Sequence, residues 1–395
     1  MIPRGKIDIG FSDIAAGMLY CLYWHTNSPK KARFTDTGNT FFCLSVRTGF
    51  DLVLKALKFP SASEILVTDV NIPDMFSIIT GHGLKPIPVS VNKHTLGISA
   101  AQVEAAITPA SKAILVTHLF GALMEMDDII TIAQKHNLII IEDCAQAYIG
   151  ASYMGNTATH ITLFSFGFIK TNTAVNGAML RINNAPLFTK VIAQNELYVQ
   201  KTNSSYFNKL LKALMALLLT QKLCYTLFYY ATKFLKKDFD TILSSLTKGY
   251  PGNDIFSQIR FRPSTANIKL MEHRLNNFKQ RHMHLRTKLA QHILQGIPEA
   301  YKTGVQNARH SHWVIPVEHP QPQELIAHLR KHGFDATQKA SSLIKLANPG
   351  HTPMPYELIP ANLVYLPNYP GMSYKDRIRL ATLVANFQHQ EVVLA

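Results

Sequence analysis

The chain has 395 residues, of which 47% are hydrophobic and 16% are charged. This composition is typical of a globular protein rather than an intrinsically disordered one. The chain has 40 Lys and Arg residues and 25 Asp and Glu residues, so its formal net charge is +15. This charge favours anionic partners such as phosphorylated metabolites or an anionic membrane surface. The basic residues form no run of five or six, which argues against nucleic acid as a partner.

The chain has four cysteines: Cys21, Cys43, Cys144 and Cys224. They are far apart and form no C-x-x-C pair, so we expect neither a disulfide framework nor a metal site built on thiolates. Reduced thiols in a cytoplasm are the plain interpretation. Residues 1–24 resemble a signal peptide only superficially, because Lys6, Asp8 and Asp13 interrupt the apolar run. We therefore expect a cytoplasmic protein.

Short apolar runs alternate with amphipathic stretches between residues 44 and 182. The predicted helices span residues 44–57, 73–83, 99–107 and 126–137. The predicted strands span residues 64–70, 85–91, 112–121, 138–143, 161–166 and 177–182. This alternation is typical of βαβ units, so the sequence predicts an α/β fold with a mostly parallel, buried sheet. In such sheets the functional groups gather beyond the carboxyl ends of the strands.

Two charged residues follow predicted strands of this sheet. Asp143 ends the strand "LIIIED", and Lys170 lies in "FSFGFIKTNT", just past another strand. Lys170 is either a surface residue whose amine reaches water or a desolvated amine with a lowered pKa, able to form a Schiff base. Asp143 is either a helix N-cap or a carboxylate that pairs with the protonated pyridine nitrogen of pyridoxal phosphate. No glycine-rich fingerprint follows the first strand, which disfavours a Rossmann dehydrogenase.

Further polar residues could contact the same group. Gln146, one predicted helical turn after Asp143, could bond a ring hydroxyl, and Ser165 could contact a phosphate. The triplet "RTG" at residues 47–49 begins a predicted helix, where free backbone N–H groups attract anions. Thr48 could equally be an ordinary N-cap.

Residues 205–240 interrupt the alternation with a long apolar stretch. Within residues 213–232 the polar exceptions include Thr220, Gln221, Lys222 and Thr232. This length could span a bilayer, but a lysine at the centre of a span costs about 2.5–3.5 kcal/mol. Three interpretations stay open, in order of preference: a buried or subunit-facing helical hairpin, a helix lying on a membrane surface, and a true span.

The remainder of the chain is rich in His and Arg. Residues 264–294 predict one long helix, and the mixed short elements after it are typical of a small α+β domain. We therefore divide the chain into an N-terminal segment (1–39), a large domain (40–204), an apolar helical insertion (205–250) and a small C-terminal domain (251–395).

Two long motifs resemble one known family. Residues 105–150, "AAITPASKAILVTHLFGALMEMDDIITIAQKHNLIIIEDCAQAYIG", and then "FSFGFIKTNT" are similar to the DegT/DnrJ/StrS family of pyridoxal-phosphate sugar aminotransferases. The likeness resumes at "IRFRPSTANIKLMEHRL" (259–275) and ends at "VYLPNYPGMSYKD" (364–376). The resemblance implies an aspartate-aminotransferase-like architecture, with a sheet of the seven-stranded type in a large cofactor-binding domain and a smaller C-terminal domain.

The resemblance also implies a role for each matching residue. Lys170 would bind the cofactor, pyridoxal 5′-phosphate, covalently and then shuttle the proton during transamination. Asp143 would pair with the pyridine nitrogen, Gln146 would bond the ring hydroxyl, and Ala145 would pack against the ring. The implied phosphate contacts are Ser165, Thr48 and Gly49.

The chain departs from the family pattern in several places. Members usually have glycine-threonine where this chain has Thr48-Gly49. We therefore expect backbone groups, more than the threonine side chain, to contact the phosphate. Arg260 stands where members lend an asparagine to the partner's active site, and we expect this arginine to grip the phosphate. The segment after Pro73 is short, which leaves Phe76 and Met75 as candidates to stack on the ring.

The resemblance implies an enzyme that converts a keto-sugar, expected to be nucleotide-linked, into an amino sugar with glutamate as the amino donor. Members of the family are typically homodimers. Two alternatives stay open. One is a non-catalytic or regulatory protein of this fold. The other is an aminotransferase that contacts the membrane surface through residues 205–240 and acts on a lipid-linked sugar.

Overall fold

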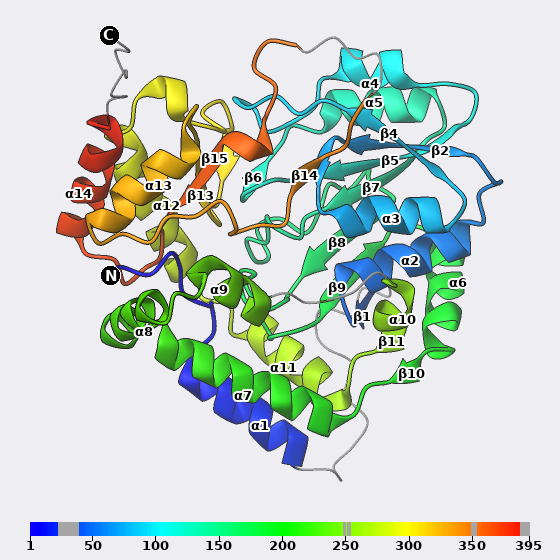
Figure 1. Cartoon of the computed structure of the whole chain (residues 1–395). Helices are drawn as coiled ribbons and strands as arrows, with labels where there is room; N and C mark the ends of the chain where they lie inside the picture. The colour runs from blue at the N-terminus through cyan, green and yellow to red at the C-terminus, as the bar shows by residue number, and fades with distance from the viewer. Residues whose placement is uncertain (23–38, 248–249, 251–253, 349–353, 388–395) are drawn as a thin grey trace.

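A seven-stranded sheet forms the centre of the larger lobe (Figure 1). The computed structural model describes residues 1–22, 39–247, 250, 254–348 and 354–387. The strand order is β1-β9-β8-β7-β5-β2-β4, in which β9 is antiparallel to both neighbours and the other adjacent pairs are parallel. The strands are β1 (Thr40–Cys43), β2 (Glu64–Thr68), β4 (Lys85–Val89), β5 (Ser111–Thr117), β7 (Ile139–Asp143), β8 (Ile161–Ser165) and β9 (Ala178–Ile182). The predicted α/β fold with a mostly parallel sheet is confirmed.

Helices cover both faces of this sheet, so successive strand residues are buried on opposite sides. On β2, Ile65 and Val67 pack in the core with α2, α3 and α6, whereas Leu66 packs in the core with α4 and α5. Two-sided burial explains why these strands are apolar runs without alternation. The helices are α2 (Val46–Leu57), α3 (Pro73–Gly81), α4 (Ala100–Ala106), α5 (Asp127–Lys135) and α6 (Ala185–Glu196).

The smaller lobe has its own hydrophobic core, built around the antiparallel pair of β13 and β15. Residues at the start of the chain belong to it, because Ile2 N–H donates to Gly333 O at 2.7 Å and Arg4 pairs with Asp335 at 2.6 Å. The main elements of the lobe are α12 (Gln280–Gln295), β13 (Ile315–Glu318), α13 (Pro322–Lys331), β15 (Leu363–Leu366) and α14 (Tyr374–Ala385).

Short strand pairs complete the fold, and the first two named here join the two lobes. Three two-stranded pairs connect distant parts of the chain: β3 (Val70–Asn71) with β14 (Ile344–Lys345), β6 (Ala122–Leu123) with β12 (Arg309–His310), and β10 (Val199–Gln200) with β11 (Phe261–Arg262). The other short elements are α9 (Phe239–Thr247), α10 (Phe256–Ile259), η1 (Glu299–Tyr301) and η2 (Pro360–Asn362).

The prediction of one long helix over residues 264–294 is wrong. Two helices replace it, α11 (Thr265–Asn276) and α12, and Asn277 ends the first by donating its N–H to His273 O at 3.1 Å. Phe278 leaves the helix and packs against Tyr148, with ring centroids 5.3 Å apart. No glycine or proline marks the break in the sequence, so the helical periodicity runs on through it.

The apolar insertion forms an elbow of two helices, α7 (Asn203–Leu219) and α8 (Lys222–Phe234), bent by 93°. In Figure 1, α7 lies along α1 (Phe11–Leu22) and close to α11. The predicted hairpin is therefore wrong in its geometry, because a hairpin requires antiparallel helices. Among the described residues, no single helix is long and apolar enough to span a bilayer, and the bent pair passes that test only when joined.

Candidate functional site

The carboxyl edge of the sheet brings the predicted residues into one region. Asp143 ends β7 and Ser165 ends β8, and these strands are parallel neighbours. After Ser165, whose Oγ accepts the N–H of Gly167 at 3.4 Å, the chain turns through a loop in which Lys170 N–H donates to Gly167 O at 2.9 Å. The Thr173 hydroxyl donates to the same carbonyl at 2.7 Å. A hydrogen-bonded loop therefore fixes Lys170 beside the edge.

The Lys170 amine lies in a poorly solvated environment. Burial lowers the pKa of Lys170 to about 8; the negative charge of Asp143 opposes this shift and the positive charge of Arg47 adds to it. The nitrogen is 4.1 Å from the centroid of the Trp313 ring, a cation–π contact that favours the charged form. Since burial outweighs the charge of Asp143, an appreciable fraction of this amine is neutral and nucleophilic near neutral pH.

Asp143 carries the opposite charge at the same edge. Its side chain is buried, and Oδ1 accepts the N–H of Ala145 at 2.9 Å. Burial raises the pKa of Asp143, while the Ala145 N–H and the charges of Lys170 and Arg47 act to lower it. A buried carboxylate of this kind is suited to a further cationic partner, because such a partner favours the ionised form.

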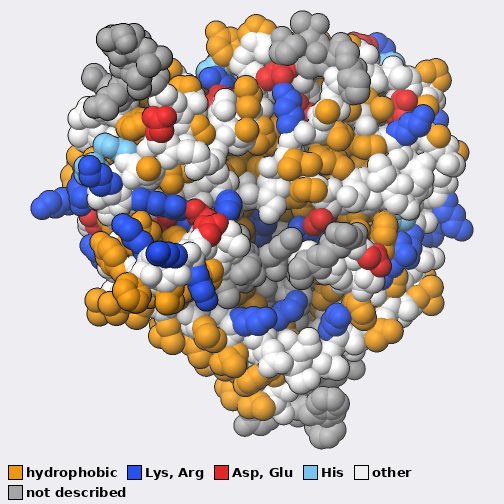
Figure 2. All heavy atoms as spheres, viewed as in Figure 1, with side chains coloured by type: hydrophobic (Ala, Val, Ile, Leu, Met, Phe, Trp, Pro, Cys, Tyr) orange, Lys and Arg blue, Asp and Glu red, His pale blue; other side chains and the backbone are white. Residues whose placement is uncertain are grey.

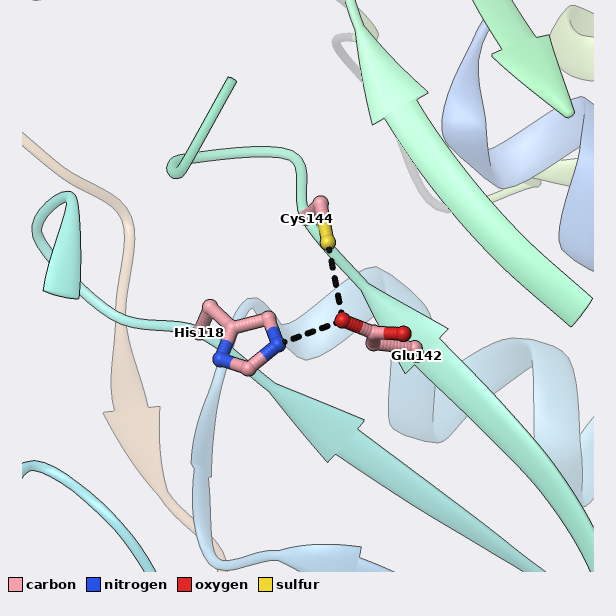
Figure 3. Close-up of side chains that lie close together, drawn as sticks. All are labelled: His118, Glu142 and Cys144. Atoms are coloured by element: carbon pink, nitrogen blue, oxygen red, sulfur yellow. Dashed lines mark hydrogen bonds and ion pairs between the residues drawn. The ribbon is translucent and has the colours of Figure 1, made fainter. Parts of the chain in front are cut away.

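Glu142, next to Asp143 on β7, anchors the strand from the opposite face (Figure 3). Its Oε1 accepts hydrogen bonds from His118 Nε2 at 2.9 Å, from Cys144 Sγ at 3.5 Å and from the Tyr153 hydroxyl. Burial alone would raise the pKa of Glu142, but these bonds outweigh it and hold the pKa at about 2. This buried network fixes the end of the strand that carries Asp143.

The cluster of His118, Glu142 and Cys144 contains residue types that bind metal ions. However, His118 Nδ1 accepts the N–H of Met124 at 3.1 Å, so the ring proton is on Nε2 and that nitrogen has no lone pair for an ion. Burial raises the pKa of the Cys144 thiol well above its usual range, which keeps the sulfur protonated. The hydrogen bonds therefore assign this cluster a structural role.

The N-terminus of α2 is the third part of the edge, since β1 leads into this helix and runs in the same direction as β7 and β8. Arg47 lies in its first turn, with Nε 2.5 Å from Asp74 Oδ2 and the guanidinium 5.2 Å from the Tyr250 ring centroid. The N–H groups of Val46 and Arg47 have no acceptor within the helix. Such a terminus, with an arginine beside it, attracts anions.

Thr48 and Gly49 have packing roles instead of the expected phosphate contacts. Thr48 is fully buried; its N–H donates to Ser45 Oγ at 3.2 Å and its hydroxyl donates to Ile259 O at 2.8 Å. A Cβ added to Gly49 would lie 2.4 Å from Cδ1 of Leu180 on β9, so glycine allows α2 to approach the sheet. The contacts of both residues are therefore inside the protein.

Replacing Gly49 with alanine should lower the free energy of unfolding. Overpacking of a core costs about 1–3 kcal/mol, which the better helix propensity of alanine offsets by about 1 kcal/mol. We expect a net loss of up to about 2 kcal/mol in urea denaturation. Gly5→Ala is the matched control, because an added Cβ there meets nothing within 4 Å. Equal midpoints for the two variants would contradict the packing role.

Three other predicted residues have contacts that differ from expectation. Gln146 lies in a turn and not on a helix, and its Oε1 accepts the N–H of Phe120 at 2.9 Å. Arg260 donates two hydrogen bonds to Asp51, at 3.0 and 3.1 Å. Phe76 is buried in the core beneath α2, which does not favour a stacking role.

The pairing of Arg260 follows from the burial of Asp51. This carboxylate is fully buried on α2, and burial alone would raise its pKa. Hydrogen bonds from His82, Arg260 and Tyr198 outweigh burial and hold the pKa of Asp51 well below its usual range. Within this chain Arg260 therefore neutralises a buried charge, and the predicted phosphate contact is not among its interactions.

Sequence reasoning missed Trp313, which lies in the loop before β13 of the smaller lobe. Besides facing the Lys170 amine, its Nε1 donates to Ile169 O at 2.9 Å. This bond joins residues 144 positions apart and so holds the two lobes together at the lysine. The only signal was composition: the chain has two tryptophans, and this one stands in the polar segment "HSHW".

A cavity of about 470 Å³ opens beside Lys170, walled by the N-terminal segment, the insertion and the smaller lobe. Arg286 lines it, with Nε donating to Ser311 O and Nη1 donating to Thr171 Oγ1, both at 3.1 Å. Its Nη2 is buried and has no hydrogen-bond partner among the described residues. A guanidinium that lines a cavity favours an anionic ligand group.

Comparison with known proteins agrees with this geometry. Residues 31–224 match the sequence model of the DegT/DnrJ/EryC1/StrS aminotransferase family. Over these residues, which are just under half of its length, the chain resembles that family. Aminotransferases of the DegT/DnrJ/EryC1/StrS family depend on pyridoxal phosphate, and solved structures of the same fold include forms with PMP. The family resemblance inferred from "IEDCAQA" and "FSFGFIK" is thus confirmed.

Individual proteins are similar to this chain in sequence over part of its length, and others are similar in fold over nearly all of it. GDP-perosamine synthase of Caulobacter vibrioides is 34% identical over 163 residues, which are 40% of this chain and 44% of that protein. The aminotransferase TlmJ of Streptoalloteichus hindustanus has a TM-score of 0.68 at 15% identity, over 98% and 97% of the two chains. The sugar aminotransferase CalS13 of Micromonospora echinospora has a TM-score of 0.66 at 18% identity, over 98% and 100%. The chain spans less than half the length of the curated relatives that it matches in sequence.

Proposed function

We propose that this protein is a pyridoxal-phosphate-dependent aminotransferase that converts a keto-sugar into an amino sugar. The observation that carries the proposal is the amine of Lys170, whose pKa is lowered by burial to about 8 and which interacts with the charge of Asp143. When bound, pyridoxal phosphate supplies an electron sink for the carbon that carries the amino group. The alternative, a non-catalytic protein of this fold, does not explain why a lysine amine with a lowered pKa is kept at this position.

The residues at the sheet edge fit this cofactor in kind and charge. Lys170 offers a nucleophilic amine to the aldehyde, Asp143 offers a carboxylate to the ring nitrogen, and the α2 terminus with Arg47 offers N–H groups to the phosphate. The oxygen end of Gln146 is already held by a backbone N–H. Its NH₂ end would therefore be the one to contact a ring oxygen. Ala145 is a small residue beside Asp143 and leaves room for a ring.

Two of these residues would also act during transamination. Lys170 would accept and return the proton that moves when the amino group changes carbon, and a pKa of about 8 suits both directions near neutral pH. Asp143 would hold the proton on the ring nitrogen by charge pairing. The loop that carries Lys170 is fixed by Thr173 and by the Trp313 bond to Ile169, which keeps the amine in place between the two half-reactions.

The cavity beside Lys170 supports an anionic sugar substrate and an acidic amino donor. The guanidinium of Arg286 and the net charge of +15 suit a nucleotide-linked sugar, and glutamate is the donor that we propose. One observation favours a second candidate, a lipid-linked sugar: Ala216, Leu219 and Tyr225 of the insertion line the same cavity. The homodimer expected from the family resemblance stays a prediction, to be tested by the mass of the protein in solution.

Two measurements test the proposal. Purified protein incubated with pyridoxal phosphate should turn yellow, and borohydride followed by peptide mass spectrometry should place the reduced cofactor on Lys170. A screen of nucleotide-linked and lipid-linked keto-sugars with glutamate should then identify an amino-sugar product. A protein that stays colourless at saturating pyridoxal phosphate would contradict the enzyme and favour the non-catalytic alternative.

Cofactor uptake should depend on pH in a way that reports the Lys170 environment. Only the neutral amine attacks an aldehyde, so the rate constant of uptake should rise with pH and level off above a pKa of about 8. A solvated lysine would keep gaining rate up to about pH 10.4. Stopped-flow absorbance from pH 6 to pH 10 measures this profile, and a rise that continues through pH 10 would show that the amine is not desolvated.

A further inference from the structure

The outward side of the α7–α8 elbow is a continuous apolar surface that no described part of the chain covers. On α8 the side chains of Leu223, Leu227, Tyr230 and Phe234 are between 60% and 87% exposed. They recur at i, i+4, i+7 and i+11, which places them on one side of the helix. On α7, Leu211, Met215 and Leu218 repeat the pattern and are between 44% and 63% exposed. We call these seven residues and Leu235 the elbow face.

The elbow face continues onto the neighbouring helix α1, where Leu19 is 50% and Leu22 is 68% exposed. Figure 2 shows apolar side chains gathered along the lower left rim of the molecule, over α8, α7 and α1, with lysines and arginines above them. Most soluble monomers expose apolar patches of no more than a few hundred Å², and larger patches mark interaction surfaces. We therefore expect this surface to bind another molecule or a membrane.

The positive charge around the elbow face indicates that its binding partner is anionic. Between Glu196 and Asp238 the chain has seven lysines and no acidic residue. Five of the lysines are exposed on the two helices or directly after α8: Lys212, Lys222, Lys233, Lys236 and Lys237. The acidic residues that follow are engaged elsewhere, Asp238 with Lys339 and Asp240 with Arg4 and Arg330. A second copy of this chain would bring like charges together, whereas an anionic surface would neutralise them.

We propose that the elbow face lies on the surface of an anionic lipid bilayer. The apolar side chains enter the boundary between headgroups and acyl chains, and the lysines reach the phosphate level beside them. The bend of 93° fits this placement, because two short helices that meet at a right angle can both lie in the membrane plane. The proposal stands on the surface alone and does not depend on the chemistry at Lys170.

Binding to vesicles tests the proposal on the full chain. We expect wild-type protein to float with vesicles of equimolar phosphatidylcholine and phosphatidylglycerol, to bind pure phosphatidylcholine weakly, and to lose affinity as salt increases. The variant Leu227→Asp/Phe234→Asp should bind the anionic vesicles at least ~10-fold more weakly, since two apolar contacts become repulsive charges. The matched control is Ile359→Asp/Ile378→Asp, which changes two exposed isoleucines outside the elbow and should float like wild type.

The outcomes separate a membrane from other occupants. Circular dichroism and cofactor uptake show whether each variant is folded, and these should be unchanged because the replaced side chains are exposed. Equal flotation of the elbow variant and wild type, or no flotation of wild type at low salt, overturns the proposal. If the elbow variant instead lowers the mass of the protein in solution and no form binds vesicles, a second copy of the chain occupies the face and the proposal fails.

Discussion

Replacing Lys170 with alanine is expected to abolish transamination, with turnover falling by at least about 10⁴-fold. Proton transfer alone contributes up to that factor, and the variant also loses the covalent bond to the cofactor. The fold should survive, since the loop around residue 170 is held by backbone and Thr173 bonds that alanine does not disturb. Amino-sugar formation measured by chromatography, together with the visible spectrum of the cofactor, checks this result. Residual turnover within 10-fold of wild type would show that a residue other than Lys170 supplies the catalytic amine.

An arginine at position 170 is the matched control for charge. Arginine keeps the positive charge and the cation–π contact to Trp313, but its very high pKa prevents it from acting as a neutral nucleophile. We expect Lys170→Arg to be as inactive as the alanine variant. Substantial activity in the arginine variant would mean that the residue acts through its charge and not as a nucleophile.

Replacing Asp143 with asparagine should lower turnover by about 10²–10³-fold, the loss typical of removing one electrostatic group that stabilises the transition state. The amide keeps an oxygen for the Ala145 N–H, so the turn after β7 should remain intact. What is lost is the negative charge that would hold the proton on the ring nitrogen. Steady-state rates at saturating cofactor measure the effect, which should appear in kcat rather than in cofactor binding alone.

Glu142→Gln provides the comparison on the same strand. Glu142 interacts with His118 and Tyr153 on the opposite face of the sheet and does not reach the proposed cofactor position. Its replacement should cost about 1–3 kcal/mol in free energy of unfolding, because buried donors lose a charged acceptor. The rate of the folded fraction should change far less than in Asp143→Asn. Equal rate losses in the two variants would argue against a specific role for the Asp143 charge.

Six of the seven strands and the position of the site followed from the sequence because they depend on local patterns, whereas the short strand β1 was not predicted. Apolar runs of five to seven residues located the strands, and parallel strands place their carboxyl ends at one edge, which brought Asp143 and Lys170 together. The helix predicted after Asp143 was wrong, since Gln146 bonds back to Phe120 and lies in a turn. Residue identity alone does not distinguish these two local conformations.

What the sequence left open depends on contacts between distant segments. Arg260 was assigned to a phosphate because its motif matched the family, but the buried charge of Asp51, far away in the chain, holds it. The same holds for Trp313, whose place over Lys170 results from the packing of two lobes. The direction in which the insertion presents its apolar residues also required the packing of α7 on α1 and α11.

Because three of the four cysteines are buried and one is exposed, the wild-type chain can be labelled at a single thiol. Burial raises the pKa of Cys21 to about 11 and of Cys43 to about 12, and it also raises that of Cys144 well above its usual range, so these sulfurs are both hidden and unreactive. Cys224 is exposed, on α8 directly beside Leu223 of the elbow face. A maleimide fluorophore can therefore be attached at a single native position, where its emission reports the polarity next to the insertion without any engineered residue.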